Sequence, residues 1–410
     1  MMEPVSGPVI TGLDIGSSKV ATVVARKGPD GLEILGVGRA DTDGMRKGAV
    51  VNVDATVKSI QQSVGDAEKM TGISIQSVFV GVSGPLIKSF NSHAAISVRN
   101  EREVTETDVG RVLSLAKAVE LPNDREVLHV LTQEFIVDDM GGIKDPRGMT
   151  GIRLDARVHV VTDDVPGTRN LVKCVEKAEL SIDDIVLGPL ASANAVLTPE
   201  EKEVGIVLLD FGAGTVEMAI FYDSALRHTF VLPLGGANIT SDVAIGLKVP
   251  WADAEVLKTS SGCAMIQKVR RDELVELPGV GGRQPRPIRR QYLSEIIEPR
   301  AEEIFGLVRR EILRSGFEEN LGAGVVLTGG GSLLDGLSDL GERVFQLPVR
   351  RGSPIGVGGL VEVVCSPGYA TAVGLAIYGS SMAEVLAARE EEAGNAGWLL
   401  RVKRFITDIF

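Results

Sequence analysis

The chain has 410 residues, of which 44% are hydrophobic and 24% charged, and this is enough sequence for two domains with separate cores. Its net charge of −12 argues against general binding to nucleic acid, which requires a basic surface. The widely spaced Cys174, Cys263 and Cys365 predict neither a disulfide framework nor a zinc site, and no signal peptide or stretch of about 20 apolar residues is evident, so we expect a cytosolic body.

Two similar segments open the two halves of the chain. Ile10–Val20 and Ile206–Val216 each contain an apolar run, then Asp-x-Gly, then small or polar residues and the start of a second apolar run. An apolar run bounded by turn residues predicts a buried strand, and two such runs joined by a few residues predict a β-hairpin. We therefore expect two related domains that face each other, with Asp14 and Asp210 at matching hairpin tips.

The remaining sequence predicts further elements and boundaries. Small-residue helices are expected over Gly188–Leu197 and Gly368–Tyr378, where they would pack closely at a domain hinge, a long helix over Leu293–Arg314, and a loop over Pro278–Pro287. The predicted division is a first core domain (1–83, 164–200 and 359–382), an inserted α/β subdomain (84–163), a second core domain (201–236 and 300–358), a further subdomain (237–299), a flexible linker (383–396) and a terminal helix (397–410).

The hairpin tips have the composition of a phosphate-binding site. Glycine and serine let backbone N–H groups approach oxygen anions, the hydroxyls of Ser17, Ser18 and Thr215 add donors, and carboxylates provide the hard oxygen ligands that Mg²⁺ prefers. One such hairpin is usually an ordinary Asp-Gly turn. Two matched copies, together with a third glycine-rich turn over Thr328–Ser332, favour nucleotide binding.

This combination resembles the phosphate and adenosine loops of the actin, heat-shock chaperone and sugar kinase superfamily, and it implies an α/β actin-like fold of two domains, each a mixed sheet with flanking helices. The resemblance implies that ATP and Mg²⁺ bind, with Asp14 and Asp210 as catalytic residues and metal ligands. The Glu255 and Lys258 pair would reach the nucleoside, although the same spacing also occurs in an ordinary solvated helix pair. The implied nucleotide contacts are Gly12, Gly16, Ser17, Ser18, Lys19, Gly212, Ala213, Gly214, Thr215, Gly236, Asn238, Glu255, Lys258, Gly329, Gly330, Gly331 and Ser332.

Within that superfamily the chain is similar to the FtsA family of bacterial division proteins along most of its length. Segments that carry the similarity include Gly205–Ala219, Ile297–Arg300 and Tyr369–Leu375. One departure concerns mechanism: where the chaperone branch has a glutamate that positions the attacking water, this chain has Gly188. We therefore expect strong nucleotide binding and, at most, weak ATPase activity. A pilus-assembly-type scaffold and a small-molecule kinase of the same superfold are the alternatives.

The last residues predict an amphipathic helix too short to span a bilayer. Its cationic polar face and aromatic apolar face suit anionic membrane lipid, whereas a helix docked on the core would not need the acidic spacer that precedes this one. Self-assembly would strengthen such a weak anchor through avidity. The apolar face consists of Trp398, Leu399, Val402, Phe405, Ile406, Ile409 and Phe410.

A cluster of arginines between residues 270 and 300 is the last candidate site. Such a run is often only a solvated face, but arginine also pairs with carboxylates of an acidic peptide. The FtsA resemblance implies that this subdomain binds the C-terminal tail of FtsZ, and we expect Arg286, Arg290 and Arg300 to take part. It further implies filaments or oligomers, contacts with other division proteins but not nucleic acid, and a place on the cytoplasmic face of the inner membrane at the division site.

Overall fold

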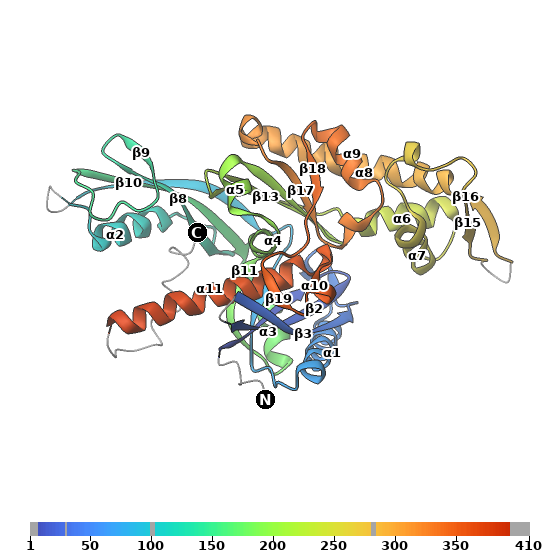
Figure 1. The fold of residues 1–410 in the computed structure, drawn as a ribbon, viewed down its shortest axis with the longest axis horizontal. Helices are drawn as coiled ribbons and strands as arrows, with labels where there is room; N and C mark the ends of the chain where they lie inside the picture. Colours follow the sequence, from blue (N-terminus) through green and yellow to red (C-terminus); the bar gives the residue numbers. More distant parts are fainter. Residues whose placement is uncertain (1–6, 29–30, 99–102, 280–283, 394–410) are drawn as a thin grey trace.

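The computed structural model of the chain describes residues 7–28, 31–98, 103–279 and 284–393, with side chains up to residue 383. Two lobes meet in the middle of the molecule, and two smaller units extend from them in opposite directions (Figure 1). One of these units is inserted into the first lobe, and the other belongs to the second lobe. The predicted terminal helix at 397–410 lies outside the described residues.

The first lobe is built on a mixed sheet. Its strands, in spatial order, are β11 (Ser181–Leu187), β6 (Ser77–Val82), β1 (Val9–Ile15), β2 (Lys19–Gly28), β3 (Gly31–Asp41) and β19 (Val357–Gly359). Apolar side chains from these strands form a buried core with the helices that cover them. Further elements of this lobe are α1 (Val53–Thr71), α3 (Val165–Lys177), α10 (Val361–Val364) and the short strands β4 (Met45–Arg46) and β5 (Ala49–Val50).

The second lobe repeats the central pattern of the first. Its sheet runs in the order β14 (Ala225–Leu232), β13 (Val216–Tyr222), β12 (Ile206–Phe211), β17 (Gly324–Thr328) and β18 (Val349–Arg351), with α5 (Pro199–Val204) and α9 (Leu337–Phe345) beside it. In the first lobe β1 pairs antiparallel with β2 and parallel with β6. In the second lobe β12 pairs in the same way, antiparallel with β13 and parallel with β17. The two predicted hairpins are therefore confirmed.

The subdomain attached to the second lobe contains α6 (Gly236–Leu247), α7 (Trp251–Ser261), β15 (Leu274–Leu277), β16 (Arg286–Arg289) and the long helix α8 (Arg290–Ser315). The predicted loop over Pro278–Pro287 is wrong at its end, because Arg286 and Pro287 already belong to β16, where Pro287 pairs with Glu276. Proline is tolerated there because both strands of a two-stranded ribbon are edge strands. Part of their backbone N–H groups face solvent and have no partner strand, so a residue without an N–H group can occupy such a position.

Two helices rich in small residues cross between the lobes, as predicted. They are α4 (Gly188–Val196) and α11 (Ala370–Ala393). The second helix differs in its bounds from the predicted Gly368–Tyr378: it begins at Ala370 and continues to Ala393, through much of the segment 383–396 that was expected to be a flexible linker. The residues of α4 are almost all buried, and a Cβ atom on Gly374 would overlap the backbone of Ala191. A Cβ on Gly12 of β1 would likewise overlap the carbonyl of Ala372. Glycine at these positions lets the helix backbones approach each other and the sheet closely.

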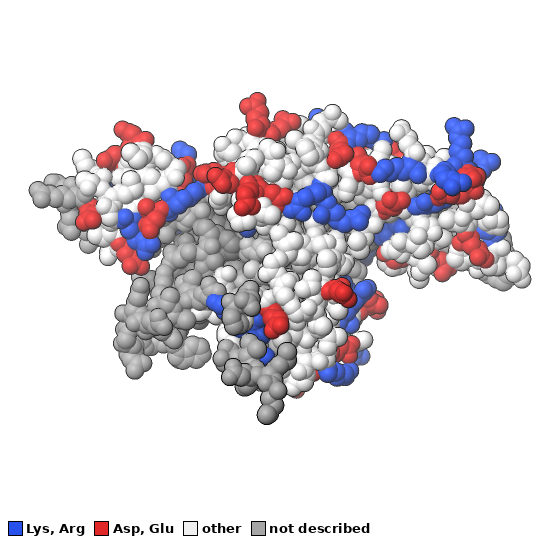
Figure 2. Space-filling view, in the orientation of Figure 1, with Lys and Arg blue, Asp and Glu red and all other residues white. Residues whose placement is uncertain are grey.

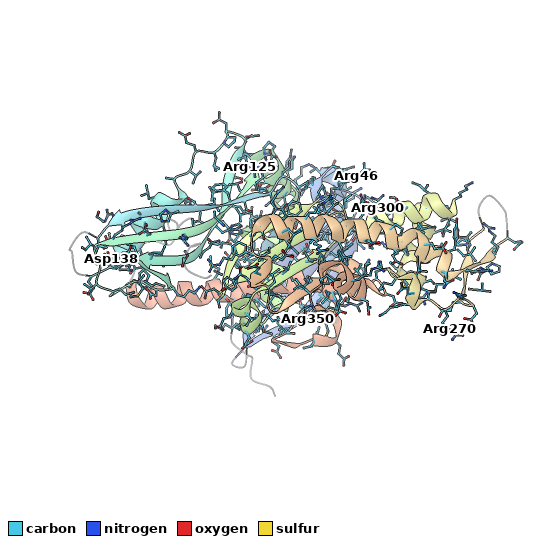
Figure 3. The ribbon with its side chains drawn as sticks, turned by 90° about the horizontal axis from the view of Figure 1, so that it is seen from above. Arg46, Arg125, Asp138, Arg270, Arg300 and Arg350 are labelled. Atoms are coloured by element: carbon cyan, nitrogen blue, oxygen red, sulfur yellow. The ribbon has the colours of Figure 1, made fainter. Side chains whose placement is uncertain are left out.

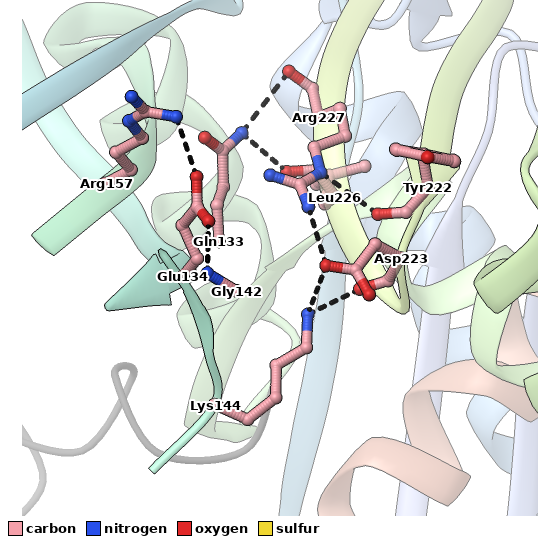
Figure 4. A network of polar contacts seen from close by, with 9 residues as sticks. All are labelled: Gln133, Glu134, Gly142, Lys144, Arg157, Tyr222, Asp223, Leu226 and Arg227. Atoms are coloured by element: carbon pink, nitrogen blue, oxygen red, sulfur yellow. Dashed lines mark hydrogen bonds and ion pairs between the residues drawn. The ribbon is translucent and has the colours of Figure 1, made fainter. Parts of the chain in front are cut away.

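The insert consists of a sheet in the order β7 (Lys88–Ser97), β10 (Arg153–Asp164), β8 (Arg125–Val137) and β9 (Met140–Ile143), with α2 (Glu106–Lys117) packed against it. It leaves the first lobe after β6 and returns at α3, but its side chains bond to β14, the edge strand of the second lobe, and to the turn that precedes β14. Gln133 Nε2 donates to the carbonyl of Leu226 at 2.9 Å, and Lys144 Nζ donates to Asp223 Oδ2 at 3.0 Å (Figure 4). His159 Nε2 lies 3.0 Å from Thr229 Oγ1. The insert therefore joins both lobes.

The insert also contacts the start of α4 through a buried histidine. His129 on β8 is 1% exposed, and its Nε2 accepts a hydrogen bond from the backbone N–H of Leu187 at 2.9 Å. Because Nε2 accepts, the neutral ring carries its proton on Nδ1. Burial lowers the pKa of His129 to about 4, so the folded chain holds this ring neutral.

We predict that His129 makes the fold sensitive to acid. A histidine whose pKa is depressed by folding contributes stability that is complete above about pH 6.5 and is lost as the pH falls towards 4, since the unfolded chain takes up the proton first. The expected loss is roughly 3 kcal/mol over this range. Urea unfolding at pH 7, 5.5 and 4.5 should show a shallower decline for His129→Gln than for the unchanged chain. Parallel declines would contradict the prediction.

Candidate functional site

The tips of the two hairpins face each other between the lobes. Each turn is closed by the same hydrogen bond, from Gly16 N–H to the Lys19 carbonyl and from Gly212 N–H to the Thr215 carbonyl, both at 2.9 Å. A Cβ on Gly214 would lie 2.7 Å from Ser17 Oγ, which shows how closely the turns approach. The structure thus brings both predicted phosphate loops to one place.

Asp210 is held by both connecting helices. Its Oδ2 accepts hydrogen bonds from Ser192 Oγ of α4 at 2.6 Å and from Thr371 Oγ1 of α11 at 3.2 Å. Burial raises the pKa of Asp210 and raises that of Asp14 to about 6, while the ammonium of Lys19 partly offsets both shifts. Two carboxyl groups desolvated close together in this way provide a favourable place for a cation.

Lys19 lies between the first hairpin and the start of α11. Its Nζ donates a hydrogen bond to the carbonyl of Gly368 and lies 4.3 Å from the centre of the Tyr369 ring. Burial lowers the pKa of this ammonium, although Asp14 and Asp210 act in the opposite direction. A positive charge is therefore held beside the two aspartates.

The third glycine-rich turn meets the second hairpin. Gly329 has a φ of 78°, and a Cβ there would overlap Asp210 Oδ1, while Gly331 lies against Phe211. Gly330 borders open space. The hydroxyl of Ser332 is turned inward and donates to the Gly329 carbonyl at 2.7 Å, so it closes the turn instead of pointing outward.

The start of α6 continues the site. Gly236 N–H donates to the Gly212 carbonyl at 3.0 Å, and Ala237 N–H donates to the Ala213 carbonyl at 2.9 Å. The side chain of Asn238 accepts from Gly235 N–H at 3.0 Å and so caps the helix. Lys258 Nζ donates to Glu255 Oε2 at 2.7 Å and to the Gly236 carbonyl at 3.2 Å, which places the predicted nucleoside pair beside the phosphate turns.

Some predicted residues lie apart from this set. Gly12 is buried against α11, where a Cβ would overlap the Ala372 carbonyl, so glycine at this position serves packing. The predicted lipid-facing residues, from Trp398 to Phe410, lie outside the described part of the chain. Among the described helices, none has the length and apolar character that crossing a bilayer requires.

The arginines of the predicted partner site differ in their contacts. Lys and Arg side chains gather at the end of the molecule formed by β15 and β16 (Figures 1 and 2), and Arg286 is exposed on β16. Arg290 instead pairs with Glu273 at 2.8 Å and Asp335 at 3.1 Å. Arg300 pairs with Asp242 at 2.5 Å and lies nearer the middle of the molecule than Arg270 (Figure 3). The guanidinium groups of Arg290 and Arg300 therefore already have carboxylate partners within the chain.

Sequence reasoning missed several polar residues that surround the hairpin tips. Ser192 and Thr371 come from the connecting helices, Ser83 from the loop after β6, and Glu217 from β13, where it pairs across the hairpin with Asp210. The sequence does offer one indication of Glu217: it is the single acidic residue in an otherwise apolar, buried strand. Burial raises its pKa to about 8, although hydrogen bonds from Ser83 and Thr215 favour the ionised form.

The donor set fits a magnesium nucleotide. Within the described residues no group of three or more Asp, Glu, His or Cys side chains could hold a metal alone. Mg²⁺ commonly keeps several waters and binds through one or two carboxylates together with phosphate oxygens, which matches a site with Asp14, Asp210 and glycine-rich turns. Lys258 and Glu255 offer further polar groups beside Gly236, which is bonded to the second turn.

Two mirrored lobes around such turns define the class of actin-like proteins. The structure is similar to one titled PilM-PilN type IV pilus biogenesis complex, with a TM-score of 0.65, 17% identity, and coverage of 92% of this chain and 99% of that chain. It is also similar to MreB 5 of Spiroplasma citri bound to AMPPNP, with a TM-score of 0.56, 13% identity, and coverage of 94% and 99%. The predicted actin-like α/β fold is confirmed.

Sequence comparison identifies the family. Residues 207–374 match the family described as Cell division protein FtsA, and residues 84–162 match the SHS2 domain inserted in FTSA. The chain is 44% identical over 413 residues to the cell division protein FtsA of Pseudomonas aeruginosa, covering 99% of both chains. The chain belongs to the FtsA family of cell division proteins.

Proposed function

We propose that this chain binds ATP and Mg²⁺ between its lobes and uses the bound state to control self-assembly in cell division. The observation that carries the proposal is the meeting of two equivalent turns, with Gly214 against Ser17 and an aspartate beside each turn. Backbone N–H groups of such turns bind phosphate oxygens, and Asp14 and Asp210 would hold the magnesium ion through its waters. A bound nucleotide would thus contact both lobes and favour one arrangement of them.

The same chain would connect FtsZ to the cytoplasmic face of the inner membrane at the division site. The apolar face of the helix predicted at 397–410 would lie in anionic lipid, and polymerised copies would bind more strongly than single ones. The C-terminal tail of FtsZ would bind to the β15–β16 end of the second-lobe subdomain. Arg286 is the best candidate among the predicted arginines, because Arg290 and Arg300 already form ion pairs. Other division proteins would join the assembly that this chain forms with FtsZ.

One co-sedimentation experiment tests the membrane and FtsZ parts of this proposal. The full chain should sediment with vesicles containing phosphatidylglycerol and should carry FtsZ into the pellet. A chain ending at residue 396 should bind these vesicles about tenfold less, because the amphipathic segment is absent. Arg286→Glu should still bind the vesicles but capture about tenfold less FtsZ, since a charged hydrogen bond contributes roughly 1.5 kcal/mol.

Arg310→Glu is the matched charge reversal for this assay. Arg310 is an exposed arginine on α8, outside the β15–β16 end, and the Arg310→Glu variant should bind vesicles and capture FtsZ like the unchanged chain. Equal vesicle binding by the full and shortened chains would rule out the terminal anchor. Equal FtsZ capture by Arg286→Glu would place the tail-binding site elsewhere.

A further inference from the structure

The short helical turn Pro367–Tyr369, which leads into α11, lies beside the third glycine-rich turn. The carbonyl of Pro367 accepts a hydrogen bond from Gly329 N–H at 3.2 Å. A Cβ on Gly368 would lie 3.8 Å from the Cα atom of Gly330. The nucleotide contacts expected from the sequence include no residue of this segment, although it borders the candidate site.

The same segment contacts the first phosphate turn through Lys19. Lys19 is the first residue of β2, and its carbonyl accepts the hydrogen bond from Gly16 N–H that closes the turn. Its Nζ donates a hydrogen bond to the carbonyl of Gly368 and lies 4.3 Å from the centre of the Tyr369 ring. An ammonium group within about 6 Å of the centre of an aromatic ring is attracted to the face of that ring. The turn before α11 therefore contacts both the first and the third predicted nucleotide loops.

The surroundings of Lys19 make its positive charge costly. Burial lowers the pKa of the ammonium group, and the charge of Arg39 acts in the same direction. The carboxyl groups of Asp14 and Asp210 oppose this shift. A magnesium ion held by these aspartates would compensate their negative charge, whereas the ring of Tyr369 favours the charged lysine with or without a metal ion.

An aromatic ring suits a phosphate-binding lysine better than a carboxylate would. A carboxylate would accept the N–H hydrogen bonds of the ammonium group and repel the phosphates, but a ring attracts the ammonium without a net negative charge. One donor of Lys19 is used by the Gly368 carbonyl, so further N–H groups remain for phosphate oxygens. The ring is itself held in place, because it packs against the core of the first lobe and the N–H of Tyr369 donates to the Ser366 carbonyl at 2.9 Å.

We infer that Tyr369 is a positioning residue for nucleotide binding: the face of its ring keeps the Lys19 ammonium charged and beside the first turn, where Lys19 would contact the phosphates of ATP. This inference rests on the proposed binding of ATP between the lobes. Tyr369 acts through Lys19 and need not touch the nucleotide. Because Tyr369 is the last residue before α11, the same contact fixes the start of that helix to the first phosphate turn.

The test compares Tyr369→Phe with Tyr369→Leu by calorimetric titration with AMPPNP and Mg²⁺. Phenylalanine keeps the ring and removes only the hydroxyl group, so the affinity should stay within about twofold of the unchanged chain. Leucine removes the ring and should weaken binding about tenfold, the effect of losing a partly desolvated cation–π contact. Equal affinities of the two variants would overturn the inference and leave the proposed function standing.

A double-mutant cycle separates an effect that passes through Lys19 from any other effect of the substitution. Lys19→Met should weaken AMPPNP binding by about tenfold or more, because a charged donor to the phosphates is lost. In the Lys19→Met chain, Tyr369→Leu should change the affinity by less than about twofold, since the ring then has no ammonium to hold. A direct contact with the nucleotide, or a distortion of α11, would persist in this chain. Additive effects of the two substitutions would therefore contradict the inference.

Tyr292→Leu is the matched control, because Tyr292 is an exposed tyrosine on α8. It should bind AMPPNP like the unchanged chain. Urea unfolding shows whether each variant is folded, and Tyr369→Met, which also lacks a ring, takes the place of the leucine variant if that chain does not fold. The methionine variant should show the same loss of affinity. If the unchanged chain binds no AMPPNP, the proposed function fails and this inference fails with it.

Discussion

Replacing Asp210 by asparagine is expected to weaken the binding of Mg²⁺ and ATP about a hundredfold while the fold remains intact. The asparagine can still accept the hydrogen bonds from Ser192 and Thr371 that hold Asp210 between the connecting helices. It cannot supply the negative charge that the magnesium ion requires. Interactions of charged groups contribute roughly 1.5 to 3 kcal/mol, and the upper part of this range corresponds to two powers of ten in affinity.

Titration with a fluorescent ATP analogue, with Mg²⁺ and again with EDTA, measures this effect. The affinity for the ATP analogue should be much higher with Mg²⁺ than with EDTA for the unchanged chain, and nearly the same in both conditions for Asp210→Asn. Asp272→Asn is a suitable control, because Asp272 is an exposed aspartate paired with Arg270 in the outer subdomain. An unchanged magnesium dependence in Asp210→Asn would remove this aspartate from the nucleotide site.

A single added methyl group at Gly374 is expected to destabilise the fold by about 3 kcal/mol, the upper end of the usual cost of overpacking. Gly374 is the point where α11 crosses α4, and the new Cβ would overlap the backbone of Ala191. A flexible side chain could move aside, but a backbone held in a buried helix cannot do so without shifting the whole crossing. The two connecting helices would be forced apart.

Chemical unfolding of Gly374→Ala and Gly306→Ala provides the comparison. Gly306 is also inside a long helix, α8, but a Cβ there would meet no atom within 4 Å. Alanine should therefore stabilise that helix by roughly 0.5 to 1 kcal/mol. If both variants shift stability in the same direction, the close crossing of α4 and α11 is not what requires glycine at 374.

The parts of the fold that could be predicted depend on local sequence. The two hairpins could be predicted because each combines apolar strands with a turn of glycine and small polar residues. The occurrence of the same pattern in both halves of the chain supported the prediction. The connecting helices were evident because small residues such as Ala191 and Gly374 accumulate in them. In each case the residues that determine the element are neighbours in the chain.

The parts that could not be predicted depend on contacts across the chain. Nothing near Gly188 in the sequence indicates that Glu217 fills the space beside it, since this follows from the packing of β13 against α4. Likewise, a count of arginines does not reveal that Arg300 is paired with Asp242, which precedes it by 58 positions. Charge patterns identify a candidate surface, but the partners within the fold decide which members of it are available.

The bonds between the insert and β14 have a consequence for nucleotide exchange. A nucleotide enclosed by two lobes can leave only when the lobes separate. In a protein whose lobes are joined only by a hinge, contacts of the two lobes with the bound phosphates would be what opposes this separation. Here Gln133, Lys144 and His159 tie the first lobe to the edge of the second at a place remote from the phosphate turns. If a nucleotide binds between the lobes as proposed, its release would have to break these bonds or move the insert together with the second lobe. A protein bound to the insert would then change how long the nucleotide stays bound.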